Sequence, residues 1–218
     1  AWNPTAECFG GLGRPGDTSV EGAEAIEALP KSFCLAAPLE VPPHELGDLE
    51  DWLVEWKWDG IRAQIVKHKN QIEIWSRGEE RVTDSFPDVC EFVSQIPGNW
   101  IMDGELVAGT WQVPALFQEL QKRLGRKKPS AAFQAENPVA YIIYDFLSEG
   151  GEDLTALPLS TRRERLALKL ADLAPTDRFG ESPAVRGQTW DEIHKAKEES
   201  RTRGAEGLML KRKSSVYE

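Results

Sequence analysis

Alternation of hydrophobic and polar residues runs through most of the chain and predicts short β-strands. One apolar run, Val139–Leu147, hardly alternates at all, which predicts a strand that is buried on both faces. A two-residue turn at Lys69-Asn70 separates two of the alternating segments and predicts a hairpin. The predicted strands are Leu53–Trp58, Ile61–His68, Gln71–Ser76, Asn99–Ala108, Val139–Leu147 and Gly207–Lys211.

Helical periodicity and helix-capping signals fall between these strands. Thr161 with Glu164, and Thr189 with Glu192, have the spacing of capping boxes, and Gly204 is a candidate helix stop. The predicted helices are Asp88–Ile96, Ala115–Leu124, a helix from Thr161 through Ala171, and a helix from Thr189 to Gly204. Because strands and helices mix without a regular βαβ repeat, we expect an α+β fold of antiparallel sheets flanked by helices.

Composition narrows the class of protein. The chain has 218 residues and a net charge of −10, which argues against binding a polyanion by bulk charge. It contains no apolar run of membrane-spanning length, so no membrane partner is expected. Its three cysteines are widely spaced, which predicts neither a metal site nor disulfides and favours the cytoplasm. Residues 1–33, rich in glycine and proline around Gly10–Gly16, are expected to be a linker.

The most informative segment is Glu55-Trp56-Lys57-Trp58-Asp59-Gly60-Ile61-Arg62. Strand alternation puts Glu55 and Lys57 on one face and the tryptophans on the other, where they are expected to be core. An ordinary lysine is protonated at neutral pH and cannot attack an electrophile. Burial and cationic neighbours can make a lysine amine nucleophilic. Lys57 is therefore a candidate nucleophile, although a lysine in such a place, taken alone, is more often a solvated strand residue beside a turn.

Three further segments carry candidate chemistry. Asp103 and Glu105 share a strand face on either side of Gly104, where a carboxylate can accept hydrogen bonds from ribose or can simply be exposed. Phe146 ends the apolar strand, where it can stack on a purine or lie in the core. Glu206 beside Gly207 suits magnesium, whereas strict alternation puts it on the face opposite Lys211. Both can line one site only if Glu206 lies at the entrance of its strand.

In this order, these segments resemble the covalent nucleotidyltransferases, which include ATP-dependent DNA ligases, RNA ligases and mRNA capping enzymes. The shared motifs are K-x-D-G-x-R (Lys57, Asp59, Gly60, Arg62), D-G-E, an aromatic strand and E-G-x-x-x-K (Glu206 to Lys211). Leu35–Glu40, Ser76-Arg77-Gly78 and the basic segment from Phe117 to Lys128 resemble the DNA ligases in particular. NAD-dependent ligases, which usually carry alanine where Arg62 stands, fit less well.

The resemblance implies a role for each matching residue, with ATP and magnesium as cofactors. Lys57 would be the nucleophile that forms lysyl-AMP, and Asp59 and Glu206 would place the metal. The nucleotide-binding residues would be Glu55 at adenine, Phe146 stacked on it, Arg62 and Glu105 at the ribose, and Lys211 near the α-phosphate. Arg77 and Arg123 would contact phosphates of the nucleotide or of DNA.

The resemblance also implies an ATP-grasp-like adenylation domain over residues 34–218, with residues 1–33 as the tail of an N-terminal DNA-binding domain. The family's last motif, a pair of lysines, and its OB domain are expected beyond Glu218. Nicked double-stranded DNA is the expected partner, bound mainly through flanking domains, and a monomer is expected. An RNA ligase, a GTP-using capping enzyme, and a nucleotide-binding module that is inactive on its own remain open.

Overall fold

The computed structural model describes residues 29–218, and its core is a six-stranded sheet with the path β3-β2-β4-β5-β6. All the pairs on this path are antiparallel, and β7 adds a parallel pairing to β5. The strands are β2 (Ile61–His68), β3 (Gln71–Ser76), β4 (Trp100–Ala108), β5 (Val139–Glu149), β6 (Glu152–Asp153) and β7 (Phe179–Glu181). The expected α+β architecture with antiparallel sheets is confirmed.

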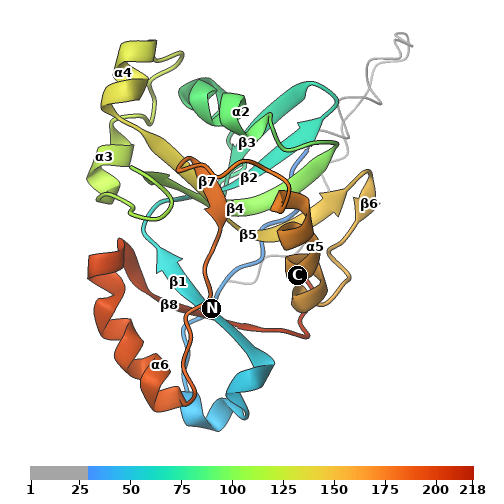
Figure 1. The fold of residues 1–218 in the computed structure, drawn as a ribbon, viewed down its shortest axis with the longest axis vertical. Coiled ribbons are helices and arrows are strands. Elements are labelled where there is room, and N and C mark those ends of the chain that lie inside the picture. Colours follow the sequence, from blue (N-terminus) through green and yellow to red (C-terminus); the bar gives the residue numbers. More distant parts are fainter. Residues whose placement is uncertain (1–28) are drawn as a thin grey trace, which may run out of the picture.

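A second sheet contains two antiparallel strands that are far apart in sequence, β1 (Trp52–Trp58) and β8 (Ala205–Arg212). It lies below the larger sheet in Figure 1, beside helix α6 (Trp190–Ala196). The segment after β7 connects the two sheets, since Ala184 bridges to Glu55 and the Val185 amide donates to the Val54 carbonyl over 2.8 Å. The C-terminal end of β1 therefore meets the large sheet where β2 begins.

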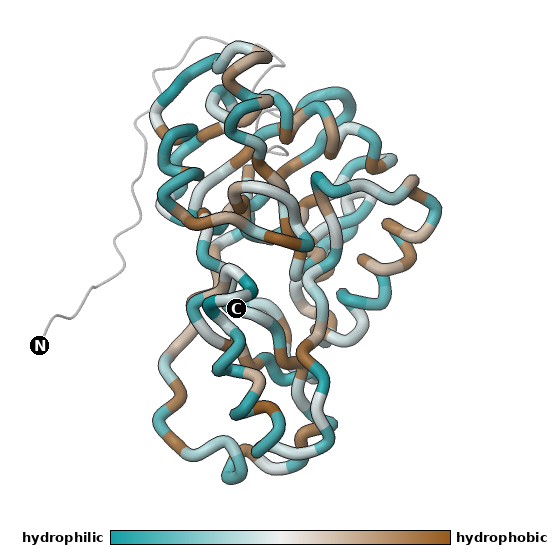
Figure 2. The backbone as a smooth tube through the Cα atoms, turned by 60° about the vertical axis from the view of Figure 1, so that its left-hand side comes forward, coloured by the Kyte–Doolittle hydropathy of each residue, from teal (hydrophilic) through white to brown (hydrophobic). Residues whose placement is uncertain are grey.

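The main hydrophobic core lies on one face of the larger sheet, against helices α2 (Pro87–Val93), α3 (Phe117–Gln121) and α5 (Leu159–Leu170). Figure 2 shows hydrophobic positions recurring along the backbone, between hydrophilic ones. The opposite face carries two smaller clusters, one centred on Trp58 and Ile142 and the other on Val66 and Leu147. Polar side chains of β2 and β4 lie between these two clusters.

Helix ends agree with the predictions in part. Thr189 caps α6 by accepting a hydrogen bond from the Glu192 amide, as predicted. A 3-10 helix, Lys197–Arg203, continues α6 to Gly204, which ends it in the left-handed conformation. The capping box at Thr161 is wrong, because α5 already begins at Leu159 after Pro158, with no side-chain cap.

Several elements were not predicted from the sequence. They are helix α4 (Ala131–Glu136), strands β6 and β7, and the 3-10 helices Pro43–Leu46, Leu49–Asp51 and Thr83–Ser85. All are short, so they carry too few residues for a periodic pattern to show. Among residues 29–218, no helix is long and apolar enough to cross a membrane.

Candidate active site

Lys57 lies at the end of β1, where it forms an ion pair with Glu206 of β8. Both side chains are about half exposed, 48% and 50%. The Lys57 side chain is therefore more exposed than expected, and its ion-pair partner is a carboxylate. The pair places the predicted nucleophile and one predicted metal ligand next to each other.

A β-bulge brings Glu206 to Lys57. Lys57 pairs with Gly207 and Trp58 with Ala205, so that Glu206 has no residue opposite it. The extra residue interrupts the strict alternation along the strand. Glu206 can thus reach the face that carries Lys57 and Lys211. Strict alternation had placed Glu206 on the face opposite Lys211, and the bulge removes this difficulty.

Glu55, two residues before Lys57, is only 1% exposed and is held by two cations. The Lys211 Nζ lies 2.6 Å from its Oε2, and an Arg163 nitrogen of α5 lies 2.9 Å from its Oε1. A buried carboxylate needs such partners to stay ionised. Lys211 also lies 4.3 Å from the centre of the Tyr144 ring, so it is anchored to β1 and β5 together.

Arg62 and Asp103 form a largely buried pair on adjacent strands, with Nη2 2.8 Å from Oδ2. The Tyr217 hydroxyl donates to Asp103 over 2.6 Å, and Arg62 also donates to the Cys34 carbonyl. Burial opposes the charge of Arg62, but the hydrogen bond and charge of Asp103 raise its pKa above the usual value. Arg62, predicted to hold the ribose, thus has a protein partner in this structure.

Glu105 is a largely buried carboxyl group of the site whose pKa is raised. Burial raises its pKa to about 8, and the negative charge of Asp103 adds to the rise. Arg62 and Lys57 lower its pKa by their positive charge, so Lys57 of the small sheet acts electrostatically on the face of the large one. Gly60 allows this close approach, because a Cβ there would overlap the Leu106 carbonyl oxygen and the Glu105 side chain.

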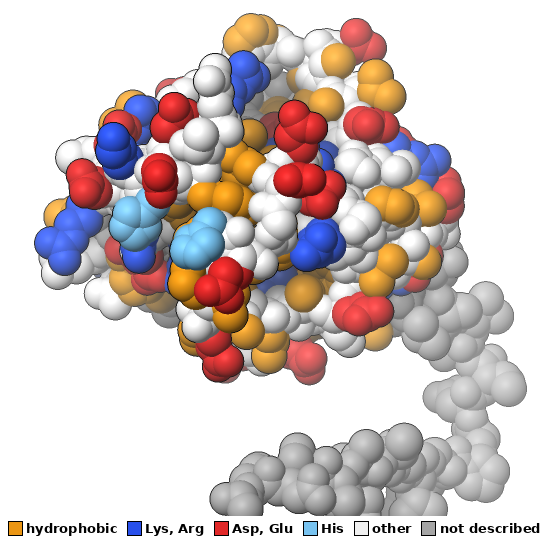
Figure 3. All heavy atoms as spheres, turned by 90° about the horizontal axis from the view of Figure 1, so that it is seen from below, with side chains coloured by type: hydrophobic (Ala, Val, Ile, Leu, Met, Phe, Trp, Pro, Cys, Tyr) orange, Lys and Arg blue, Asp and Glu red, His pale blue; other side chains and the backbone are white. Residues whose placement is uncertain are grey.

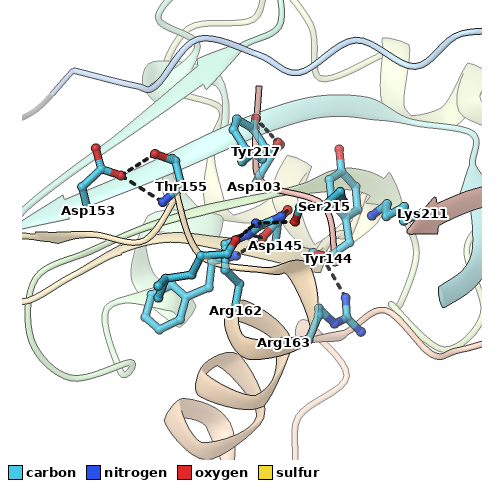
Figure 4. Close-up of polar contacts among 12 residues, drawn as sticks. Asp103, Tyr144, Asp145, Asp153, Thr155, Arg162, Arg163, Lys211, Ser215 and Tyr217 are labelled. Atoms are coloured by element: carbon cyan, nitrogen blue, oxygen red, sulfur yellow. Dashed lines mark hydrogen bonds and ion pairs between the residues drawn. The ribbon is translucent and has the colours of Figure 1, made fainter. Parts of the chain in front are cut away.

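The predicted adenine-stacking role of Phe146 is wrong. Its side chain is fully buried in the main core, on the face of the sheet away from Lys57. Tyr144 lies on the opposite face instead, where it is partly buried and contacts Lys211. It lies in a second bulge, since Asp103 pairs with Asp145 and Gly104 with Ile143, and Tyr144 is skipped between them. Figure 4 shows Tyr144 beside Lys211.

The predicted phosphate contact of Arg123 is also wrong, because its side chain is 0% exposed. It pairs with Asp88 and donates to the carbonyls of Ser85 and Asn137 over 3.0 Å each. Arg123 therefore ties together the helices at the edge of the core. Arg77, by contrast, is exposed just after β3, and its amide donates to the Arg62 carbonyl over 3.2 Å.

The predicted metal ligands do not form a closed site. Within residues 29–218, no group of three or more His, Cys, Asp or Glu side chains could hold a metal ion. Asp59 is partly buried, and its amide donates to the Gly204 carbonyl over 3.3 Å. One exposed carboxylate, Glu206, suits a magnesium ion that takes most of its ligands from water and substrate phosphates.

The fold defines the class of protein. It is similar to mycobacterial DNA ligase D complexed with ATP and MES, with a TM-score of 0.65 at 21% identity, covering 88% of this chain and 56% of that chain. It is also similar to Chlorella virus DNA ligase-adenylate, with a TM-score of 0.63 at 18% identity, covering 87% of this chain and 63% of the other. The fold is thus that of a ligase nucleotidyltransferase domain.

Sequence comparison identifies the family. Residues 34–218 match the family model of the ATP dependent DNA ligase domain, and the chain belongs to this family. It is 34% identical over 208 residues to a probable DNA ligase of Koribacter versatilis, and 37% identical over 179 residues to a DNA ligase of Natronomonas pharaonis. These matches cover 86% and 78% of the chain but only 36% and 30% of the relatives, so it spans about a third of their length.

Proposed function

We propose that residues 34–218 are the adenylation domain of an ATP-dependent DNA ligase, in which Lys57 accepts AMP. The observation that carries this proposal is the convergence on Lys57 of residues from three separate strands. Glu206 of β8 contacts Lys57, and Glu55 lies on the same face of β1. The positive charge of Lys57 also lowers the pKa of Glu105 on β4. Membership of the family and the likeness to an adenylate-bearing ligase structure support the same assignment.

The proposed reaction begins when the half-exposed Lys57 ammonium gives up a proton to solvent water and leaves Glu206. The amine then attacks the α-phosphorus of ATP, so that a P–N bond forms while the bond to the bridging oxygen breaks and pyrophosphate leaves. Magnesium bound with ATP would offset charge on the phosphates. Glu206, with Asp59, would hold that ion.

The remaining site residues would bind the nucleotide. Tyr144, in place of Phe146, would offer an aromatic face to adenine, and Glu55 shares the partner Lys211 with it. Glu105 would accept or donate hydrogen bonds at the ribose, with Arg62 beside it. Lys211, now on Glu55, would move to the α-phosphate, and exposed Arg77 would contact phosphates of the nucleotide or of a nick. Lysyl-AMP would then activate the 5′-phosphate of nicked double-stranded DNA for sealing.

Labelling with nucleotide tests this proposal against its rivals. The chain is incubated with α-labelled ATP or GTP and magnesium, and run on a denaturing gel. We expect label from ATP only. Label from GTP alone would favour a capping-type enzyme, and ATP binding without label would favour a nucleotide-binding module. On the face shown in Figure 3, acidic and basic side chains are interspersed and do not gather into one basic patch.

A further inference from the structure

Arg163 of α5 connects three elements that line the site. Its guanidinium donates to Glu55 of β1 over 2.9 Å, to the Tyr144 carbonyl of β5 over 2.9 Å, and to the Ser182 carbonyl over 2.7 Å. It also pairs with Glu181 at 2.8 Å, and its side chain is only 11% exposed. Figure 4 shows it reaching from the helix toward Tyr144, below Lys211.

These contacts use the particular shape of arginine. A guanidinium presents five N–H donors in a rigid planar fork, so one side chain can hold several acceptors in fixed directions. The Tyr144 carbonyl belongs to the bulge residue of β5, where the regular ladder is interrupted. Arg163 therefore donates a hydrogen bond to the carbonyl of a residue that is skipped in the pairing of β4 with β5.

Arg163 also balances the negative charge of the buried Glu55 carboxylate. Glu55 is almost completely buried, and its two cationic partners are Arg163 and Lys211. Lys211 is nearly a quarter exposed and contacts the Tyr144 ring, whereas Arg163 is fixed from several sides. If Lys211 leaves Glu55 for a phosphate, Arg163 remains to balance the buried carboxylate.

We infer that Arg163 is a positioning residue for nucleotide binding. It fixes the Glu55 carboxylate and the Tyr144 bulge so that a purine can bind between them, and it keeps Glu55 paired when Lys211 moves to the α-phosphate. This inference rests on the proposed function, because it assumes that ATP binds beside Glu55 and Tyr144. It concerns the affinity of the site for ATP rather than attack by Lys57.

The test compares Arg163→Gln and Arg163→Lys with Arg165→Gln, which removes a partly exposed arginine of the same helix that pairs with Glu152. Lysyl-AMP formation is measured against ATP concentration at saturating magnesium, after circular dichroism has confirmed folding. Loss of a hydrogen bond to a buried charged group predicts that Arg163→Gln raises the half-saturating ATP concentration about tenfold or more. The rate at saturating ATP should change far less.

Arg163→Lys keeps the charge without the fork, so we expect only partial recovery of ATP affinity, and Arg165→Gln should match the wild type. In a Glu55→Gln background, Arg163→Gln should have a much smaller effect, because the two residues act together. A folded Arg163→Gln or Arg163→Lys variant with wild-type ATP dependence would overturn the inference alone, as would fully additive effects with Glu55→Gln. A wild-type chain that neither binds ATP nor accepts AMP would overturn the proposed function together with it.

Discussion

At the scale of single residues, the site is a set of ionisable groups whose partners differ from those that alternation predicts. Lys57 faces a carboxylate, Arg62 faces Asp103, and Glu55 is buried between two cations. Each of these charges is satisfied by the protein itself. Binding of ATP would therefore require exchange of partners, above all at Lys57 and Lys211.

Glu105 provides a prediction about pH at this scale. Burial raises its folded-state pKa to about 8, from a usual value near 4.5, so the folded state holds a proton that the unfolded state releases. Its contribution to stability is complete below about pH 4.5 and is lost as the pH rises through about 8. In Glu105→Gln, the thermal midpoint should fall less between pH 5 and 8 than in the wild type.

Exposed Glu119 gives the matched control, since Glu119→Gln should leave the wild-type dependence of the midpoint on pH unchanged. Equal slopes for the wild type and Glu105→Gln would show that Glu105 ionises in the folded state as it does in the unfolded chain.

At the scale of elements, two bulges and one turn form the site. The bulge at Glu206 brings a carboxylate to Lys57, and the bulge at Tyr144 puts Tyr144 and Phe146 on opposite faces of the sheet. The turn through Gly60 lies directly against Glu105 and Leu106 of β4. The geometry of the site therefore depends on irregularities in the strands more than on the strands themselves.

Gly60 and Gly207, the glycines of the first and last motifs, differ in how closely other atoms approach them. A Cβ at Gly60 would overlap backbone and side-chain atoms of β4, whereas a Cβ at Gly207 has nothing within 4 Å. We expect Gly60→Ala to lower the free energy of unfolding by roughly 2 kcal/mol or more, because overpacking against backbone cannot relax easily. Gly207→Ala should cost less than about 1 kcal/mol. Urea denaturation measures both, and equal losses would contradict the close approach at Gly60.

At the scale of the whole molecule, the sequence predicted the β1 to β5 strands and β8, the antiparallel architecture and the family. It did so because these strands are long enough to show alternation, and because the motifs combine residues that are rarely found together. It did not predict which residues leave the regular pattern. Phe146 and Tyr144 are two positions apart and would share a face in a regular strand, so only the bulge decides which one is buried. Arg123 looked like part of a basic surface, but it is buried by partners from α2 and from the segment after α4.

The central claim is that Lys57 becomes covalently bound to AMP. The most direct test is mass spectrometry of the intact chain and its peptides after incubation with ATP and magnesium. We predict one AMP per chain, located on Lys57, and no adduct in Lys57→Ala; Lys67→Ala, in the neighbouring strand β2, is the matched control and should retain the adduct. AMP on a different residue, or an adduct that persists in Lys57→Ala, would contradict the account.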